Sequence, residues 1–198
     1  MNEFLKLEYE QCLSLIKYYD ERHHSLVKYS SGLSSAVPSL LLAVYQLSGS
    51  AVNYFWQFTT IISVVTTIGL LSLFTVLIQN RLYFIYPARQ VNSIRKNSLE
   101  NLVEENFENQ MYLNTTFNAF KWSSSQTLLN LFVAMQVSAF LGLSIFSYQK
   151  IICPSEYSIG WPLIVGHITL FTLFGLSARY LYSNSKYHPD KSVHRETN

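Results

Sequence analysis

The longest stretch without charge constrains the fold more than any other feature of the chain. No Asp, Glu, Lys or Arg occurs in Tyr29–Asn80, a run of 52 residues. Two further charge-free runs cover Trp122–Gln149 and Tyr157–Ala178. Charged residues make up 13% of the chain, whereas a soluble domain usually carries about 25%. The runs therefore predict a membrane protein.

The lengths of these runs predict how often the chain crosses a bilayer. A helix needs about 20 mostly apolar residues to span roughly 30 Å of hydrocarbon, so the first run is long enough for two crossings and a turn. We expect an all-α membrane protein with four transmembrane helices in two hairpins. The expected spans lie near residues 33–47, 55–79, 127–146 and 159–179. The expected segments are an amphipathic helix (1–32), a first hairpin (33–79), a helical loop (80–125), a second hairpin (126–179) and a disordered tail (180–198).

The distribution of Lys and Arg predicts the topology, because these residues concentrate in short cytoplasmic loops. Thirteen of the 14 Lys and Arg residues lie before the first span, between the second and third, or from Arg179 onward; only Lys150 lies on the other side. We therefore expect both termini and the 80–125 loop to be cytoplasmic, where they form a small helical layer. The charged start, Asn2–Glu8, argues against a cleavable signal peptide.

The first 30 residues predict a helix with one packing face. Side chains recur at alternating spacings of four and three, which is the heptad pattern of helices that pack lengthwise. This heptad face consists of Leu5, Tyr9, Cys12, Ile16, Tyr19, His23 and Leu26. Two interpretations follow. Several copies associate through this face as a homo-oligomer, with a tetramer favoured, or the helix packs against the chain's own 80–125 loop.

The 80–125 loop is too long for a simple connection. Its first part predicts a helical extension of the second span, kinked at Pro87, and its second part, Asn97–Phe120, predicts an acidic amphipathic helix. Basic residues in the first part alternate with aromatic and amide side chains. Guanidinium groups bind phosphate and aromatic rings stack on bases, but the same pattern fits lipid headgroups. The candidate residues for binding an oligonucleotide or a protein partner are Arg81, Arg89, Gln90, Asn92, Arg95 and Lys96.

Polar side chains also occur within the expected spans. Hydroxyl groups on one helix face either line a water-filled pore or hydrogen-bond between closely packed helices. Amides and a histidine in hydrocarbon need partners. The candidate pore-lining or interhelical residues are Thr59, Ser63, Thr66, Thr67, Asn130, Gln136 and His167.

Several kinds of chemistry lack sequence support. Arg179, at a cytoplasmic end, is the one ionised side chain in an expected span, which disfavours proton- or sodium-coupled transport. Metal-ligand spacing is missing, because the two cysteines are distant and His23 and His24 are adjacent. The seven glycines form no phosphate-binding loop. We expect no enzyme activity, no cofactor and no metal site.

The motif Arg89-Gln90-Val91-Asn92-Ser93-Ile94-Arg95 follows a long apolar span, and the span itself follows a charged helix. This layout, over about residues 5–100, resembles the small membrane effectors of bacterial anti-phage systems. The transmembrane effector of the Hailong system is the first likeness. It implies a homo-oligomeric, channel-like protein of the bacterial inner membrane, controlled by the oligonucleotide product of a partner nucleotidyltransferase, that depolarises the membrane. The membrane subunit of Kiwa is the second. It implies a non-conducting sensor or scaffold that docks a cytoplasmic, DNA-binding defence partner.

Overall fold

Four long helices make up most of the structure. The computed structural model describes residues 3–48, 52–101, 113–155 and 158–186. In chain order, the helices are α1 (Glu3–Ser48), α2 (Val52–Asn101), α3 (Ser125–Ile152) and α4 (Gly160–Asn184). These described ranges contain no strand, which confirms the expected all-α class.

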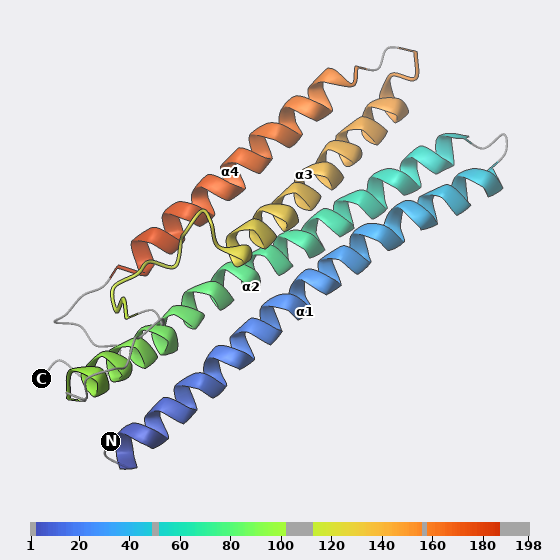
Figure 1. The fold of residues 1–198 in the computed structure, drawn as a ribbon. Helices are drawn as coiled ribbons and strands as arrows, with labels where there is room; N and C mark the ends of the chain where they lie inside the picture. The colour runs from blue at the N-terminus through green and yellow to red at the C-terminus, as the bar shows by residue number, and fades with distance from the viewer. Residues whose placement is uncertain (1–2, 49–51, 102–112, 156–157, 187–198) are drawn as a thin grey trace, which may run out of the picture.

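The helices form an antiparallel row. α1 packs along α2, α2 along α3, and α3 along α4, whereas α1 meets α3 and α2 meets α4 only over short stretches (Figure 1). At the end where α1 begins, α1 and α2 reach beyond the other two helices. We call this projecting part, α1 residues 3–28 with α2 residues 81–101, the stalk. The α2 portion alone is about 30 Å long at the usual helical rise.

Two apolar layers hold the first three helices together. One consists of Val27, Phe74, Leu77, Val133 and Ala134. The other consists of Val37, Leu41, Leu70, Val137 and Phe140. Both contain side chains from α1, α2 and α3, and both Leu70 and Leu77 on α2 are fully buried. α2 is therefore the central helix, while α4 attaches to this core mainly through α3.

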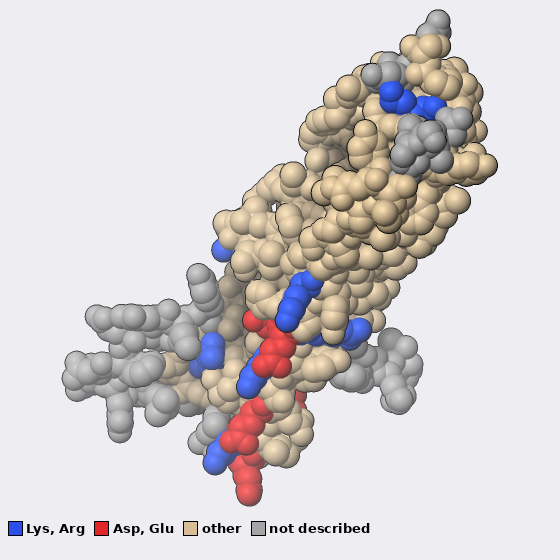
Figure 2. All heavy atoms as spheres, turned by 90° about the vertical axis from the view of Figure 1, so that its right-hand side faces the viewer, with Lys and Arg blue, Asp and Glu red and all other residues tan. Residues whose placement is uncertain are grey.

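Three of the helices are long and apolar enough to cross a membrane: α2, α3 and α4. α1 is not among them, although it contains the first expected span, because Ser34, Ser35, Pro38, Ser39 and Gln46 interrupt its apolar residues. Figure 2 shows that the charged side chains visible on that face gather toward the stalk, whereas the opposite half of the molecule is nearly free of them.

Some element boundaries differ from the sequence-based expectations. The expected helical extension of the second span is confirmed, because α2 continues through Pro87 to Asn101 as one helix that includes the basic stretch. Residues 113–124 are irregular rather than part of an acidic helix; residues 102–112 lie outside the described part of the chain. We call residues 113–124 the re-entry segment. α4 extends to Asn184, beyond the expected end of the last span, and residues 187–198 of the expected tail also lie outside the described part.

The heptad face of α1 packs against α2. Cys12 and His23 are buried, and the other members, Leu5, Tyr9, Ile16, Tyr19 and Leu26, are half-buried. The Tyr19 ring stacks on Tyr83 of α2, with 6.3 Å between the ring centroids. In the single chain this face packs against the helical first part of the 80–125 loop. Association of several copies through it stays a prediction.

Candidate functional site

A buried arginine lies where the stalk joins the apolar half of the molecule. Arg81 is the first charged residue after the long uncharged run, and it is only 7% exposed. Its Nε donates a hydrogen bond to the Ala119 carbonyl at 2.9 Å, and its Nη1 donates to Gln126 Oε1 at 2.8 Å. Burial lowers the pKa of Arg81 to about 10, against the opposing effect of Asp20. The guanidinium therefore stays charged at neutral pH.

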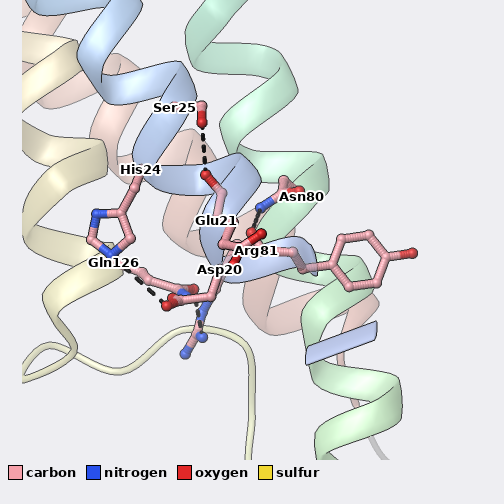
Figure 3. A network of polar contacts seen from close by, with 8 residues as sticks. Asp20, Glu21, His24, Ser25, Asn80, Arg81 and Gln126 are labelled. Atoms are coloured by element: carbon pink, nitrogen blue, oxygen red, sulfur yellow. Dashed lines mark hydrogen bonds and ion pairs between the residues drawn. The ribbon is translucent and has the colours of Figure 1, made fainter. Parts of the chain in front are cut away.

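The side-chain amide of Gln126 connects Arg81 to the carboxylate of Asp20 (Figure 3). Gln126 accepts from Arg81 and donates from Nε2 to Asp20 Oδ1 at 3.0 Å. The other oxygen of Asp20 lies 3.9 Å from His24 Nε2. The chain Asp20–Gln126–Arg81 thus ties α1, α3 and α2 together. We call the set Asp20, Asn80, Arg81 and Gln126 the polar junction; Asn80 adds a bond from its side chain to the Tyr19 carbonyl at 2.8 Å.

His23 lies beside the polar junction and is fully buried. Neither ring nitrogen has a hydrogen-bond partner in the described part of the chain. Burial is the largest cause that lowers the pKa of His23 to about 4; the positive charge of Arg81 and the ring of His24 add to it, and Asp20 opposes it. The imidazole is therefore neutral at physiological pH. Among the other buried side-chain oxygens without a described partner are those of Asn80, Thr127 and Asn130.

His23 should make the stability of the protein depend on pH. Its pKa is about 4 in the folded protein and 6.5 in the absence of the fold, so the unfolded chain binds more protons between these values. The stabilisation is complete above about pH 6.5 and is lost as the pH falls toward 4, a change of about 3 kcal/mol. His23→Leu should flatten this part of the pH profile of thermal unfolding in detergent. The exposed neighbour serves as control: His24→Gln removes only a smaller cause of the lowered His23 pKa, so most of the wild-type pH dependence should remain. A His23→Leu profile as steep as the wild type would contradict the prediction.

Further side chains of α2 hold the re-entry segment in place. Arg89 donates to the Phe117 carbonyl from Nε at 3.0 Å and from Nη2 at 2.6 Å, and it also donates to the Ser185 carbonyl. Asn92 donates to the Asn114 carbonyl at 2.7 Å. These bonds satisfy the Phe117 and Asn114 carbonyl oxygens, which have no helical partner in this irregular segment. Arg89 also links α2 to the residue that follows α4.

The six predicted ligand-binding residues therefore do not share one open surface. Arg81 and Asn92 are buried, Arg89 and Arg95 are half-buried, and Gln90 and Lys96 are exposed. Arg95 donates to the Tyr9 hydroxyl of α1 at 3.2 Å from Nε and 3.1 Å from Nη2. Four of the six side chains thus contact other parts of the same chain. Oligonucleotide binding by this cluster stays a prediction.

The predicted hydroxyl face of α2 lies within the row of helices. Thr59, Ser63 and Thr66 are buried, and Thr67 is half-buried. The hydroxyls of Thr59, Thr66 and Thr67 donate to carbonyls of α2 itself. In a single copy this face packs against neighbouring helices. Of the other three candidates, Asn130 is buried, Gln136 is half-buried and His167 is exposed on α4.

The outward faces of the helices differ in a way that the sequence reasoning missed. On α2 the outward residues are large and apolar, as in Ile61, Val64, Val65, Ile68 and Leu71. On α4 they are Leu163, Ile164, Ile168, Phe171 and Leu176. The expected span of α1 also exposes large side chains, Leu40, Leu42, Tyr45 and Leu47. Beside them it exposes a row of small and hydroxyl residues at helical spacing, Gly32, Ser35, Ala36, Ser39 and Ala43. We call this row the small-residue face. The spacing of four between Ser35, Ser39 and Ala43 was visible in the sequence, but the direction in which they point was not.

No protein-family model, curated protein or solved structure matches the chain. The geometry itself defines an all-helical protein in which three helices are long and apolar enough to cross a membrane. A paired-helix stalk joins them through a buried polar junction.

Proposed function

We propose that the chain is a multi-pass protein of the bacterial inner membrane, with α1 as a fourth span and both termini in the cytoplasm. α1 lies antiparallel along α2, which is itself apolar enough to cross. Residues 29–48 of α1 carry no charge. A helix with several polar groups can still cross when neighbouring helices shield it from lipid. The asymmetry of Lys and Arg then puts the stalk on the cytoplasmic side.

The small-residue face of α1 is the observation that carries the functional proposal. α1 is not among the three helices that are apolar enough to cross a membrane. The polar side chains of its small-residue face point away from its own neighbours, whereas Ser30 and the Ser34 hydroxyl turn inward. Small residues at a spacing of four let membrane helices approach closely, and hydroxyl groups can line an aqueous path. The protein is therefore a homo-oligomeric, channel-like effector with α1 at the central axis. The large apolar faces of α2 and α4 contact the lipid.

The stalk supplies a means of control. α1 and α2 run unbroken from the stalk into the apolar half, so a displacement of the stalk changes the position of α1 at the axis. The polar junction transmits the same displacement to α3, because Gln126 bonds to both α1 and α2. The likeness to the Hailong effector adds an oligonucleotide as the signal and anti-phage defence by membrane depolarisation as the role.

Expression of the chain in bacteria should collapse the membrane potential, measured with a voltage-sensitive dye. The double variant Ser35→Leu and Ser39→Leu should preserve the potential, because leucine side chains fill the proposed axis. The matched control is Ser72→Leu with Thr75→Leu, which removes two exposed hydroxyls from the outward face of α2. This control should depolarise cells as the wild type does.

Two outcomes would contradict the proposal. A normal potential at confirmed membrane expression of the wild type would exclude conduction. Equal depolarisation by both double variants would exclude α1 as the pore helix.

A non-conducting sensor or scaffold is the second candidate, and a different observation favours it. In the stalk, α2 exposes aromatic and amide side chains along one stripe, formed by Tyr86, Gln90, Ser93 and Asn97. Tyrosine is enriched where proteins dock on one another. In this case the stripe docks a soluble partner, and cells that express the chain keep a normal potential.

A further inference from the structure

An open, largely apolar groove lies between α3 and α4. Its volume is about 530 Å³, within the range of about 300–1,000 Å³ typical of small-molecule sites. Its walls include Met135, Ala139, Leu143, Phe146, Leu163 and Leu170. No Asp, Glu, Lys or Arg lines it, so an ionised ligand has no counter-charge there.

Two glycines shape the floor of this groove. A Cβ atom at Gly142 would lie 3.2 Å from the Pro162 carbonyl oxygen, and one at Gly166 would lie 3.3 Å from the Ser138 carbonyl oxygen. Each helix therefore presents a glycine to the backbone of the other. This close approach leaves a hollow beside the contact where no side chain projects from either glycine.

His167 is the one residue with an ionisable side chain in the groove lining. Its Nδ1 lies 2.7 Å from the Leu163 carbonyl oxygen of the same helix. A carbonyl oxygen can only accept, so in the neutral imidazole Nδ1 carries the proton and Nε2 is an acceptor. No hydrogen bond joins Nε2 to another residue that the structure describes, and the exposed side chain lines both this groove and a second hollow on α4. The Ser138 hydroxyl already donates to Ala134.

The position of His167 along α4 indicates that its Nε2 acceptor needs a hydrogen-bond partner. The residue lies seven positions after the start of α4 at Gly160, or about 10 Å along the helix. In a bilayer whose hydrocarbon is about 30 Å thick, this position lies inside the apolar region, where a polar group needs a partner. A ligand that donates one hydrogen bond would satisfy Nε2.

We propose that the groove binds an apolar molecule with one hydroxyl group, which donates its hydrogen bond to Nε2 of His167. An ordinary acyl chain offers no donor at this depth, and a lipid ester offers only acceptors. The inference rests on the membrane placement of α3 and α4 in the proposed function. It does not require that the protein conducts ions.

Photolabelling tests the ligand class directly. The purified protein in lipid nanodiscs is exposed to a long-chain alcohol that carries a photoreactive group, or to an alkane of equal length with the same group. The alcohol should label peptides from Met135–Phe146 and Ile159–Leu170 about three- to tenfold more strongly, the factor expected for one hydrogen bond.

Variants separate the hydrogen bond from the shape of the groove. His167→Phe should label equally with both probes, whereas His167→Gln, which keeps an acceptor, should retain most of the preference. Thr172→Val removes an exposed hydroxyl of α4 outside the groove lining and should behave as the wild type. Ala139→Trp should reduce labelling by both probes, because the indole occupies the groove.

Three results would overturn the inference. The first is equal labelling of the wild type by alcohol and alkane, which indicates a plain acyl chain. The second is an alcohol preference that survives in His167→Phe. The third is efficient cross-linking of Ala139→Cys between copies with no labelling, which indicates a neighbouring subunit in the groove. Because no ion flux is measured, labelling as expected together with a normal membrane potential would reject the channel and keep this site.

Discussion

Replacing Arg81 by leucine is expected to lower the free energy of unfolding by about 3 kcal/mol, because a buried hydrogen-bonded charge is removed while its partners remain. The Ala119 carbonyl and Gln126 Oε1 both lose their donor. Asp20 loses the charge that balances it across Gln126. Leucine has a similar apolar bulk but no N–H group, so none of these bonds can re-form.

The reactivity of the Cys12 thiol measures the separation of α1 from α2 directly. Cys12 is 5% exposed on the face of α1 that packs against α2, and burial together with Glu8 raises the pKa of this thiol. A thiol-reactive dye should therefore label it only when α1 separates from α2. The experiment is a thermal ramp in detergent at fixed pH, with the exposed Cys153 changed to serine in every variant.

Two control variants distinguish the loss of the buried hydrogen bonds from the loss of a positive charge at any position. Lys17 pairs with Glu21 at 3.8 Å on the exposed surface of the stalk, and Lys17→Ala should leave the midpoint nearly unchanged. Arg81→Lys keeps the charge but not the two-pronged donor, so its midpoint should fall between those of the wild type and Arg81→Leu. An Arg81→Leu midpoint equal to that of the wild type would show that the polar junction does not stabilise the fold.

Gly142→Val is expected to weaken the attachment of α4, with a cost of about 1–3 kcal/mol from overpacking. The new Cβ would meet a main-chain oxygen of Pro162 at 3.2 Å, and the two added methyl groups crowd the same site. Main-chain atoms cannot rotate away as a flexible side chain can, so the two helices must separate. Thermal unfolding and protease sensitivity of the α3–α4 connection measure this effect.

Gly175→Val is the matched control on α4. A Cβ at Gly175 meets no atom within 4 Å, and valine favours a helix over glycine by a few tenths of a kcal/mol. This variant should be as stable as the wild type or slightly more so. Similar losses in both variants would show that helix propensity, rather than the close contact between α3 and α4, determines the outcome.

The heptad spacing of α1 correctly identified the residues of this helix that pack. It did not show whether they pack against a second copy or against the same chain, since any apolar helix surface offers a similar partner. The basic stretch of α2 was compatible with ligand binding because the sequence does not show which of its polar residues, such as Arg81 and Gln90, are buried and which are exposed. Their burial differs because only Arg81 faces the re-entry segment and α3.

The sequence by itself determined the helical class and the positions of the long apolar segments, because charge-free runs of about 20 or more mostly apolar residues have the length and composition of helices that can cross a membrane. It also located the helix of the stalk through its heptad spacing. The tertiary structure alone decided which face of each helix is used. A periodic pattern defines a face but not the neighbour that covers it. The polar junction combines Asp20, Arg81 and Gln126, residues on three helices that no local spacing relates. For the same reason, only the packed structure shows that Thr59, Ser63 and Thr66 of α2 turn inward while Ser35 and Ser39 of α1 turn outward.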